Sequence, residues 1–127
     1  MESIIHYIDG TRFEAESRGH RLVCDQPESN SGMTPSEFLL AALGTCAGFY
    51  ALHYLKTRSL PVEGLKVRVT AEKATQPTRL GSFRIEITTA ALDPRHQEGV
   101  LRAAKACLVH NTLLHAPQIE TVLTPAG

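Results

Sequence analysis

The sequence has no surplus of positive charge. Lysine and arginine together number 13 in the 127 residues, and aspartate and glutamate also number 13, so the formal net charge is zero. A domain that follows a phosphate backbone needs a positive surplus, because neutralising phosphates supplies most of such binding. We therefore expect no nucleic-acid partner. The remaining composition, 43% hydrophobic and 20% charged, is typical of a globular protein, and the length suits a single domain over residues 1–127.

The chain also lacks a secretion signal and a long hydrophobic run. The first seven residues hold no basic stretch followed by an apolar one, which a signal peptide would need. The most apolar run, residues 38–52, is shorter than the roughly 18 to 20 residues that cross a bilayer. We therefore expect a cytoplasmic protein without a membrane partner, and we interpret the run as part of a buried core helix.

Cysteine is scarce, with only Cys24, Cys46 and Cys107 in the chain. An odd number of cysteines without an export signal is typical of free thiols in a reducing compartment. The spacing of metal ligands is missing as well. His53 follows Cys46 by seven positions, about 10.5 Å along a helix, which is too far for the two to share one ion. Cys107 and His110 form only an isolated pair. We expect no metal and no cofactor, and we interpret Cys24 as a core residue.

Alternating segments and turn residues predict six strands. Asp9 and Gly10 form a strong hairpin signal between the first two strands, and Arg18 and Gly19 form a turn before the third. Two later segments place apolar residues at every second position, as in an antiparallel sheet with one covered face. The predicted strands are residues 3–8, 12–17, 20–24, 65–72, 83–88 and 119–124.

Two helices are predicted between these strands. Thr34 and Glu37 have the spacing of a capping box, and Pro35 suits the first helical position. The first helix should therefore begin here and end near Arg58. Asp93 is the candidate N-cap of the second helix. One apolar stripe of this helix consists of Val100, Ala103, Ala104, Cys107 and Leu108. The predicted order is β-β-β-α-β-β-α-β, an α+β fold without internal repeats.

Each predicted helix carries one cysteine among small residues. A cysteine in an apolar helix, taken alone, is more often a core residue than a nucleophile. Cys46, however, lies between Gly44 and Gly48, and two glycines in mid-helix indicate that another backbone approaches closely. Helices that contact through glycine and alanine come closer than the usual axis separation of about 8–10 Å. Cys107 is then predicted to come within disulfide range of Cys46, a Cα separation of roughly 4.4–6.8 Å.

A reactive thiol must ionise, and burial opposes ionisation. Cys46 lies about three turns into its helix, where the field of the helix N-terminus has faded. We therefore expect a cation from elsewhere in the chain, with Arg18 as the first candidate. Arg12 and Arg21 are weaker candidates, and an ordinary solvated arginine is the alternative. Glu37 either orients that arginine or completes the capping box, and its spacing favours the capping box.

Two segments of the chain resemble a known family. Residues 34–46 (TPSEFLLAALGTC) and 103–113 (AAKACLVHNTL) resemble the OsmC/Ohr family, the osmotically induced protein C and organic hydroperoxide resistance group. The resemblance covers nearly the whole chain and implies an intertwined homodimer with antiparallel sheets around two central helices. It also implies a thiol-dependent peroxidase that reduces organic hydroperoxides in oxidative-stress defence. Carried over by position, Cys46 is the peroxidatic thiol and Cys107 the resolving thiol, and a dithiol reductant such as a lipoylated protein or thioredoxin resets the pair.

Two positions depart from the pattern of this family. Its established peroxidases carry an activating glutamate ten residues before the first cysteine. This chain has Ser36 there, with Glu37 about 100° further around the helix. Proline usually follows the second cysteine, where this chain has Leu108. Both departures resemble the OsmC-like branch, which shares the fold and the cysteines. The alternative function is therefore a stress protein or small-ligand-binding module with the same fold and no peroxidase activity.

Overall fold

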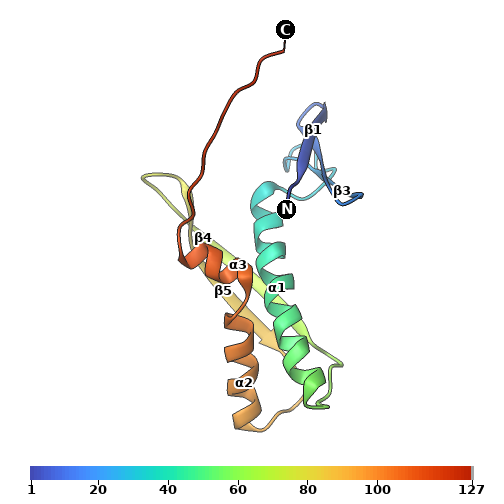
Figure 1. Cartoon of the computed structure of the whole chain (residues 1–127), viewed down its shortest axis with the longest axis vertical. Helices are drawn as coiled ribbons and strands as arrows, with labels where there is room; N and C mark the ends of the chain where they lie inside the picture. Colours follow the sequence, from blue (N-terminus) through green and yellow to red (C-terminus); the bar gives the residue numbers. More distant parts are fainter. Residues whose placement is uncertain (127) are drawn as a thin grey trace. The chain divides into compact units, whose positions relative to one another are not determined.

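The computed structural model describes residues 1–126 of the chain. In this range the elements are β1 (Ile4–Asp9), β2 (Arg12–Ser17), β3 (His20–Cys24), α1 (Pro35–Thr57), β4 (Lys66–Ala74), β5 (Arg79–Thr88), α2 (Pro94–Lys105) and α3 (Leu108–Leu114) (Figure 1). The chain forms two compact units, each made of two segments. The sheet unit comprises Met1–Ala42 and Val69–Arg84, and the helix unit comprises Leu43–Arg68 and the residues from Ile85 onward. The single domain over residues 1–127 stays a prediction.

The sheet unit contains the antiparallel sheet β1-β2-β3. The turn from β2 to β3 consists of Arg18 and Gly19, whose φ angles are +52° and +83°. Two consecutive residues with positive φ match the right-handed twist of the strands that they join, so both predicted turn residues have the role expected of them. The turn from β1 to β2 passes through Gly10, with a φ of +48°, between the paired residues Asp9 and Arg12. The three predicted strands of this sheet are confirmed within one residue.

One face of this sheet carries apolar side chains. Strand pairing places Ile5 opposite Ala15 and Ala15 opposite Leu22, so these three residues form a row across the sheet. The next row contains Tyr7 and Phe13, whose ring centroids lie 5.4 Å apart. Side chains two positions apart along a strand share a face, so the two rows are continuous. Of these side chains, the large ones are exposed.

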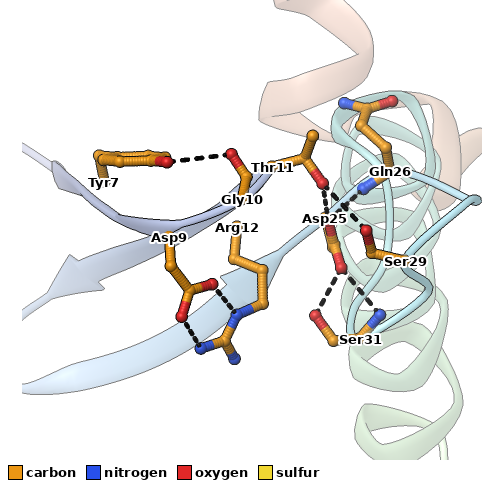
Figure 2. A network of polar contacts seen from close by, with 9 residues as sticks. All are labelled: Tyr7, Asp9, Gly10, Thr11, Arg12, Asp25, Gln26, Ser29 and Ser31. Atoms are coloured by element: carbon orange, nitrogen blue, oxygen red, sulfur yellow. Dashed lines mark hydrogen bonds and ion pairs between the residues drawn. The ribbon is translucent and has the colours of Figure 1, made fainter.

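The sheet unit contains a buried carboxylate, that of Asp25. Figure 2 shows Asp25 surrounded by hydrogen-bond donors, with the Thr11 and Ser31 hydroxyls each 2.5 Å from one of its oxygens. The backbone N–H groups of Gln26 and Ser31 donate at 2.7 and 3.0 Å. The hydrogen bonds from Ser31 and then Thr11 hold the pKa of Asp25 well below its usual range. This network orders the loop that leads from β3 to α1.

Helix α1 begins as the sequence predicts. The Thr34 backbone N–H donates to the Glu37 carboxylate at 2.9 Å, and the Glu37 N–H donates to the Thr34 hydroxyl at 3.2 Å. These reciprocal bonds are the capping box. The helix ends at Thr57, one residue before the predicted end. By length and composition α1 would also be able to cross a bilayer, a test that core helices of other proteins pass as well.

The helix unit has an apolar core. Along α1 the buried side chains follow a spacing of four residues, which makes one stripe on the helix: Leu43, Ala47, Ala51 and Leu55. Val100 and Ala104 of α2 are buried as well, and Val100 belongs to one cluster with Ala51 and Leu55. Partly buried side chains from the adjoining loop and strands pack on this cluster: Leu60, Val62, Leu65 and Ile87. One face of α1 therefore belongs to this core.

Strands β4 and β5 form the second sheet, which has two strands, so the α+β fold with antiparallel sheets is confirmed. Two details differ from the predicted order. The second helix breaks at Ala106 and Cys107, and the chain continues as the short helix α3. Residues 119–124 form no strand within the described range, because no other segment there pairs with them. An apolar stripe does not reveal a two-residue break in a helix, and a strand needs a partner strand.

Candidate active site

Cys46 lies in mid-helix on α1, in the helix unit. Its neighbours Leu43 and Ala47 belong to the buried stripe, and Cys46 is half-buried at the side of that stripe. Gly48 faces β4, since a methyl group built there would lie 3.3 Å from Val67 Cγ2. Gly48 therefore allows close packing of a β4 side chain on α1, whereas the expectation was the close approach of another backbone.

Cys107 lies between two helices rather than inside one. Its backbone is extended, with φ of −60° and ψ of 135°, and it is the N-cap of α3. The Cys107 sulfur accepts a hydrogen bond from the His110 backbone N–H at 3.4 Å. The His110 ring spans the same break, because its Nδ1 lies 3.0 Å from the Lys105 carbonyl oxygen and must donate to it. Cys107 is fully buried, so its inward orientation is confirmed although its place on a helical stripe is wrong.

Cys46 and Cys107 are free thiols that influence each other's ionisation. The Cys107 thiol lowers the pKa of Cys46. The backbone N–H groups of Val109 and Leu108, in the first turn of α3, lower the pKa of Cys46 as well. Three donor groups therefore favour the Cys46 thiolate.

The environment changes the two pKa values in opposite directions. Burial is the largest single effect on Cys46 and raises its pKa, but the three donors together outweigh burial, so the pKa is lowered. For Cys107, burial raises the pKa, and donation of its proton to Cys46 raises it further. Cys46 is thus the thiol that ionises first, and Cys107 is the thiol that keeps its proton.

None of the three donor groups that act on Cys46 is a cation. Sequence reasoning expected Cys107 near Cys46 but missed the backbone N–H groups of Leu108 and Val109. Cysteine is not among the preferred N-cap residues, so no sequence signal marked Cys107 as the start of a new helix. Without that break, the amides of Leu108 and Val109 would be bonded inside one long helix. The donors exist because the helix stops at the residue that supplies the second sulfur.

Arg18 and Glu37 belong to the sheet unit, whereas both cysteines belong to the helix unit. Among residues 1–126, Arg12 pairs with Asp9 at 2.8 Å and Arg21 lies 3.7 Å from Glu14, while no carboxylate pairs with Arg18. Arg18 therefore stays the first candidate for a cation near Cys46, and this contact stays a prediction. The capping role of Glu37 is confirmed by its bond to Thr34, and its role in orienting an arginine stays a prediction.

A groove of about 530 Å³ lies beside Cys107 in the helix unit. Its lining includes Ala106 and Leu108, which flank the cysteine, and Tyr50 of α1. Asn111 and His115 add polar groups. In the part of the chain that the structure describes, no group of three or more histidine, cysteine or acidic side chains is placed to hold a metal ion.

Comparison with protein families decides the relationship. The family model described as OsmC-like protein matches residues 28–122, which include both cysteines. The chain belongs to the OsmC-like family. Its predicted membership of the OsmC/Ohr group is thereby confirmed.

Solved structures of other family members share the fold. The chain is similar to a Psychrobacter arcticus 273-4 protein named for osmotic stress induction and detoxification response, with 22% identity, 87% and 85% of the two chains covered, and a TM-score of 0.78. An OsmC-like protein from Mycoplasma pneumoniae gives 20% identity, 91% and 87% coverage, and a TM-score of 0.77. The organic hydroperoxide resistance protein OhrB of Bacillus subtilis gives 18% identity, 91% and 93% coverage, and a TM-score of 0.58. No curated protein sequence matches the chain.

Proposed function

We propose that this OsmC-like protein is a thiol-dependent peroxidase that reduces organic hydroperoxides in the cytoplasm, in defence against oxidative stress. The observation that carries the proposal is a pair of free thiols whose pKa values change in opposite directions, with that of Cys46 lowered and that of Cys107 raised. A structural relative named for organic hydroperoxide resistance supports the choice of substrate.

The proposed reaction begins at Cys46. Its thiolate attacks the terminal oxygen of the hydroperoxide, the O–O bond breaks, and the alkoxide leaves and takes a proton to become the alcohol. Cys46 is then a sulfenic acid. Cys107 attacks that sulfur, forms the disulfide and releases the oxygen as water. Cys107 suits this second step because its thiol acts on Cys46 strongly enough to lower the Cys46 pKa.

A dithiol reductant, such as a lipoylated protein or thioredoxin, completes the cycle. One of its thiolates attacks the disulfide, its second thiol releases the mixed disulfide, and both cysteines become thiols again. The groove next to Cys107 is the proposed place of the substrate, because its lining by Tyr50 and Leu108 suits an alkyl or aryl group. Arg18 is the proposed source of additional positive charge for the Cys46 thiolate.

The proposed functional form is a homodimer. The apolar face of the β1-β2-β3 sheet leaves Ile5, Tyr7 and Leu22 between 56% and 61% exposed. In residues 119–124, which form no strand in the single chain, Ile119 and Leu123 are 85% and 89% exposed. Exposed apolar surface of this extent marks an interaction site more often than a free surface. A second copy that covers the sheet and pairs with the extended segment would bury both.

The test is a stopped-flow measurement of cumene hydroperoxide consumption together with a count of free thiols. One equivalent of hydroperoxide should reduce the number of titratable thiols from three to one. Cys46→Ser should abolish consumption, and Cys107→Ser should allow one turnover that ends in a sulfenic or over-oxidised Cys46. Cys24→Ser is the matched control and should behave as the parent protein. If Cys46→Ser consumes hydroperoxide as fast as the parent, the proposal fails.

The second candidate is a small-ligand-binding module without peroxidase activity. Ser36, at the position of the activating glutamate, and the open groove beside Cys107 favour this alternative. The pKa of Cys46 separates the two functions. For the peroxidase, the midpoint of Cys46 alkylation by iodoacetamide should lie below the ordinary value of about 8.5, and Cys107→Ala should raise it because one donor is lost. An ordinary midpoint that Cys107→Ala leaves unchanged would favour the binding module.

A further inference from the structure

A second contact joins α1 to α2, away from the cysteines. The Tyr54 side chain of α1 packs directly on Gly99 of α2, which is buried. A methyl group built on Gly99 would overlap the phenol oxygen and the ring of Tyr54. Glycine is unfavourable in the middle of a helix, so its presence here serves the close approach of the tyrosine.

The Tyr54 ring is held in place from two sides. Its hydroxyl lies 3.0 Å from the Nδ1 atom of His96, which is on the same helix as Gly99. The guanidinium carbon of Arg58 lies 3.7 Å from the centre of the ring, in a cation–π contact. The ring therefore cannot rotate away from α2 without losing both contacts. The contact between Tyr54 and Gly99 therefore holds α1 and α2 at one position relative to each other.

The contact between Tyr54 and Gly99 and the two cysteines are separated by the same number of residues on both sides. Tyr54 lies eight positions after Cys46 on α1, about 12 Å along the helix, and Cys107 lies eight positions after Gly99. Helix α2 covers the first six of these eight positions and ends at Lys105. Tyr54 of α1 packs on Gly99 of α2, and Tyr50 of α1 lines one groove with Ala106 and Leu108, so α1 and α2 run antiparallel, which can be followed in Figure 1. A shift of α2 along α1 at Gly99 must also shift Cys107.

We propose that Tyr54 and Gly99 are positioning residues, which set the register of α2 on α1 in which the Cys107 sulfur meets Cys46. The inference rests on the proposed redox use of the cysteine pair. Tyr54 touches neither sulfur, so it acts only through the position of α2. A side chain larger than hydrogen at position 99 would move α2 away from α1 or along it, and the two sulfurs would separate.

The experiment measures the equilibrium between the dithiol and the disulfide form in mixtures of reduced and oxidised dithiothreitol. In this exchange oxidised dithiothreitol accepts two electrons and two protons from Cys46 and Cys107, so no peroxide is needed. Gly99→Ala should lower the equilibrium constant for disulfide formation about tenfold, which corresponds to about 30 mV for two electrons. The melting temperature, measured in parallel on the dithiol form, reports folding separately.

A double variant distinguishes a change in the register of α2 on α1 from a general loss of stability. Tyr54→Leu removes the outer ring atoms that a methyl group at position 99 would overlap. In the double variant the equilibrium constant should therefore return to within about threefold of the parent, a non-additive result for two contacting residues. Gly48→Ala is the matched control: it adds the same methyl group to α1 on the side of β4 and should change the constant less than about twofold.

The outcomes are separable from those of the proposed function. A folded Gly99→Ala protein with the constant of the parent, or a double variant no better than Gly99→Ala, overturns the positioning role. If Gly99→Ala does not fold, Tyr54→Leu alone decides: it should lower the constant about threefold through the loosened contact, and an unchanged constant overturns the inference. If the parent protein forms the disulfide in dithiothreitol but consumes no hydroperoxide, the proposed peroxidase function is overturned, and the positioning role of Tyr54 and Gly99 stands. A parent that forms no disulfide overturns both.

Discussion

The two units of the chain bury opposite kinds of side chain. The helix unit encloses a stripe of apolar residues, with Leu55 0% exposed, and places both sulfurs beside it. The sheet unit encloses the Asp25 carboxylate and leaves Leu22 56% exposed. Burial of apolar surface is the main favourable contribution to folding, so the helix unit has its own core, whereas the sheet unit depends on hydrogen bonds and on whatever covers its apolar face. The candidate site lies in the unit with the stronger core.

The difference in apolar burial between the two units can be tested most directly by making the same substitution in both. Leu55→Ala removes a fully buried side chain next to Ala51 and Val100, and it should lower the free energy of unfolding by about 2–5 kcal/mol. Leu22→Ala removes an exposed one and should cost less than about 0.5 kcal/mol in a single chain. Urea unfolding monitored by circular dichroism gives both values.

The cost of Leu22→Ala in free energy of unfolding can also be measured at several protein concentrations. If a second copy covers the apolar face, the cost of Leu22→Ala should grow with concentration, because the dimer stabilises the parent by mass action. The cost of Leu55→Ala should grow much less. Equal costs for the two substitutions in dilute protein would mean that the sheet unit has an apolar core after all.

The polar centre of the sheet unit predicts a pH dependence. The folded-state pKa of Asp25 is lowered, so its contribution to stability is fully present above the unfolded value of about 3.9 and is lost as the pH falls through the folded value. Asp25→Asn should destabilise the protein at pH 7, because its amide presents hydrogens to the donors from Thr11 and Ser31. It should also flatten the loss of stability below about pH 4.

Urea midpoints at several pH values between 7 and 2.5 test this expectation. Ser29→Ala is a suitable control, because Ser29 contacts Thr11 rather than the carboxylate. A parent and an Asp25→Asn variant with parallel pH curves would contradict the role assigned to the network.

The sequence predicted most of the fold because most of the fold is set locally. Turn residues with positive φ, such as Gly19, and the Thr34 and Glu37 cap act over three or four positions and can be identified without a structure. The proximity of Cys46 and Cys107 is a prediction from two apolar helices that each carry one cysteine among small residues. What escaped prediction depends on a single backbone angle at Cys107, which ends one helix and turns the amides of the next toward both sulfurs. No composition or period encodes that angle.

Residues 119–124 show a different limit. Their alternation predicts a strand, and the pattern itself is sound. A strand, however, is defined by its partner, and the described part of the chain offers none. In the same way, periodicity could not show that Tyr54 packs on Gly99, because a glycine in a helix gives no information about the side chain that it admits.

The smallest effect is expected for Glu37→Gln, which tests whether Glu37 acts only as part of the capping box. Glutamine can replace glutamate in a capping box, so Glu37→Gln should change the free energy of unfolding by only a few tenths of a kcal/mol, whereas Thr34→Ala should cost about 1 kcal/mol. With capping as its only role, Glu37→Gln should also leave the rate of hydroperoxide consumption within about twofold, because the three donors to Cys46 lie in the helix unit. The rate is measured by stopped flow at saturating reductant. A rate lowered tenfold in a protein with the stability of the parent would instead assign the Glu37 charge to the orientation of Arg18.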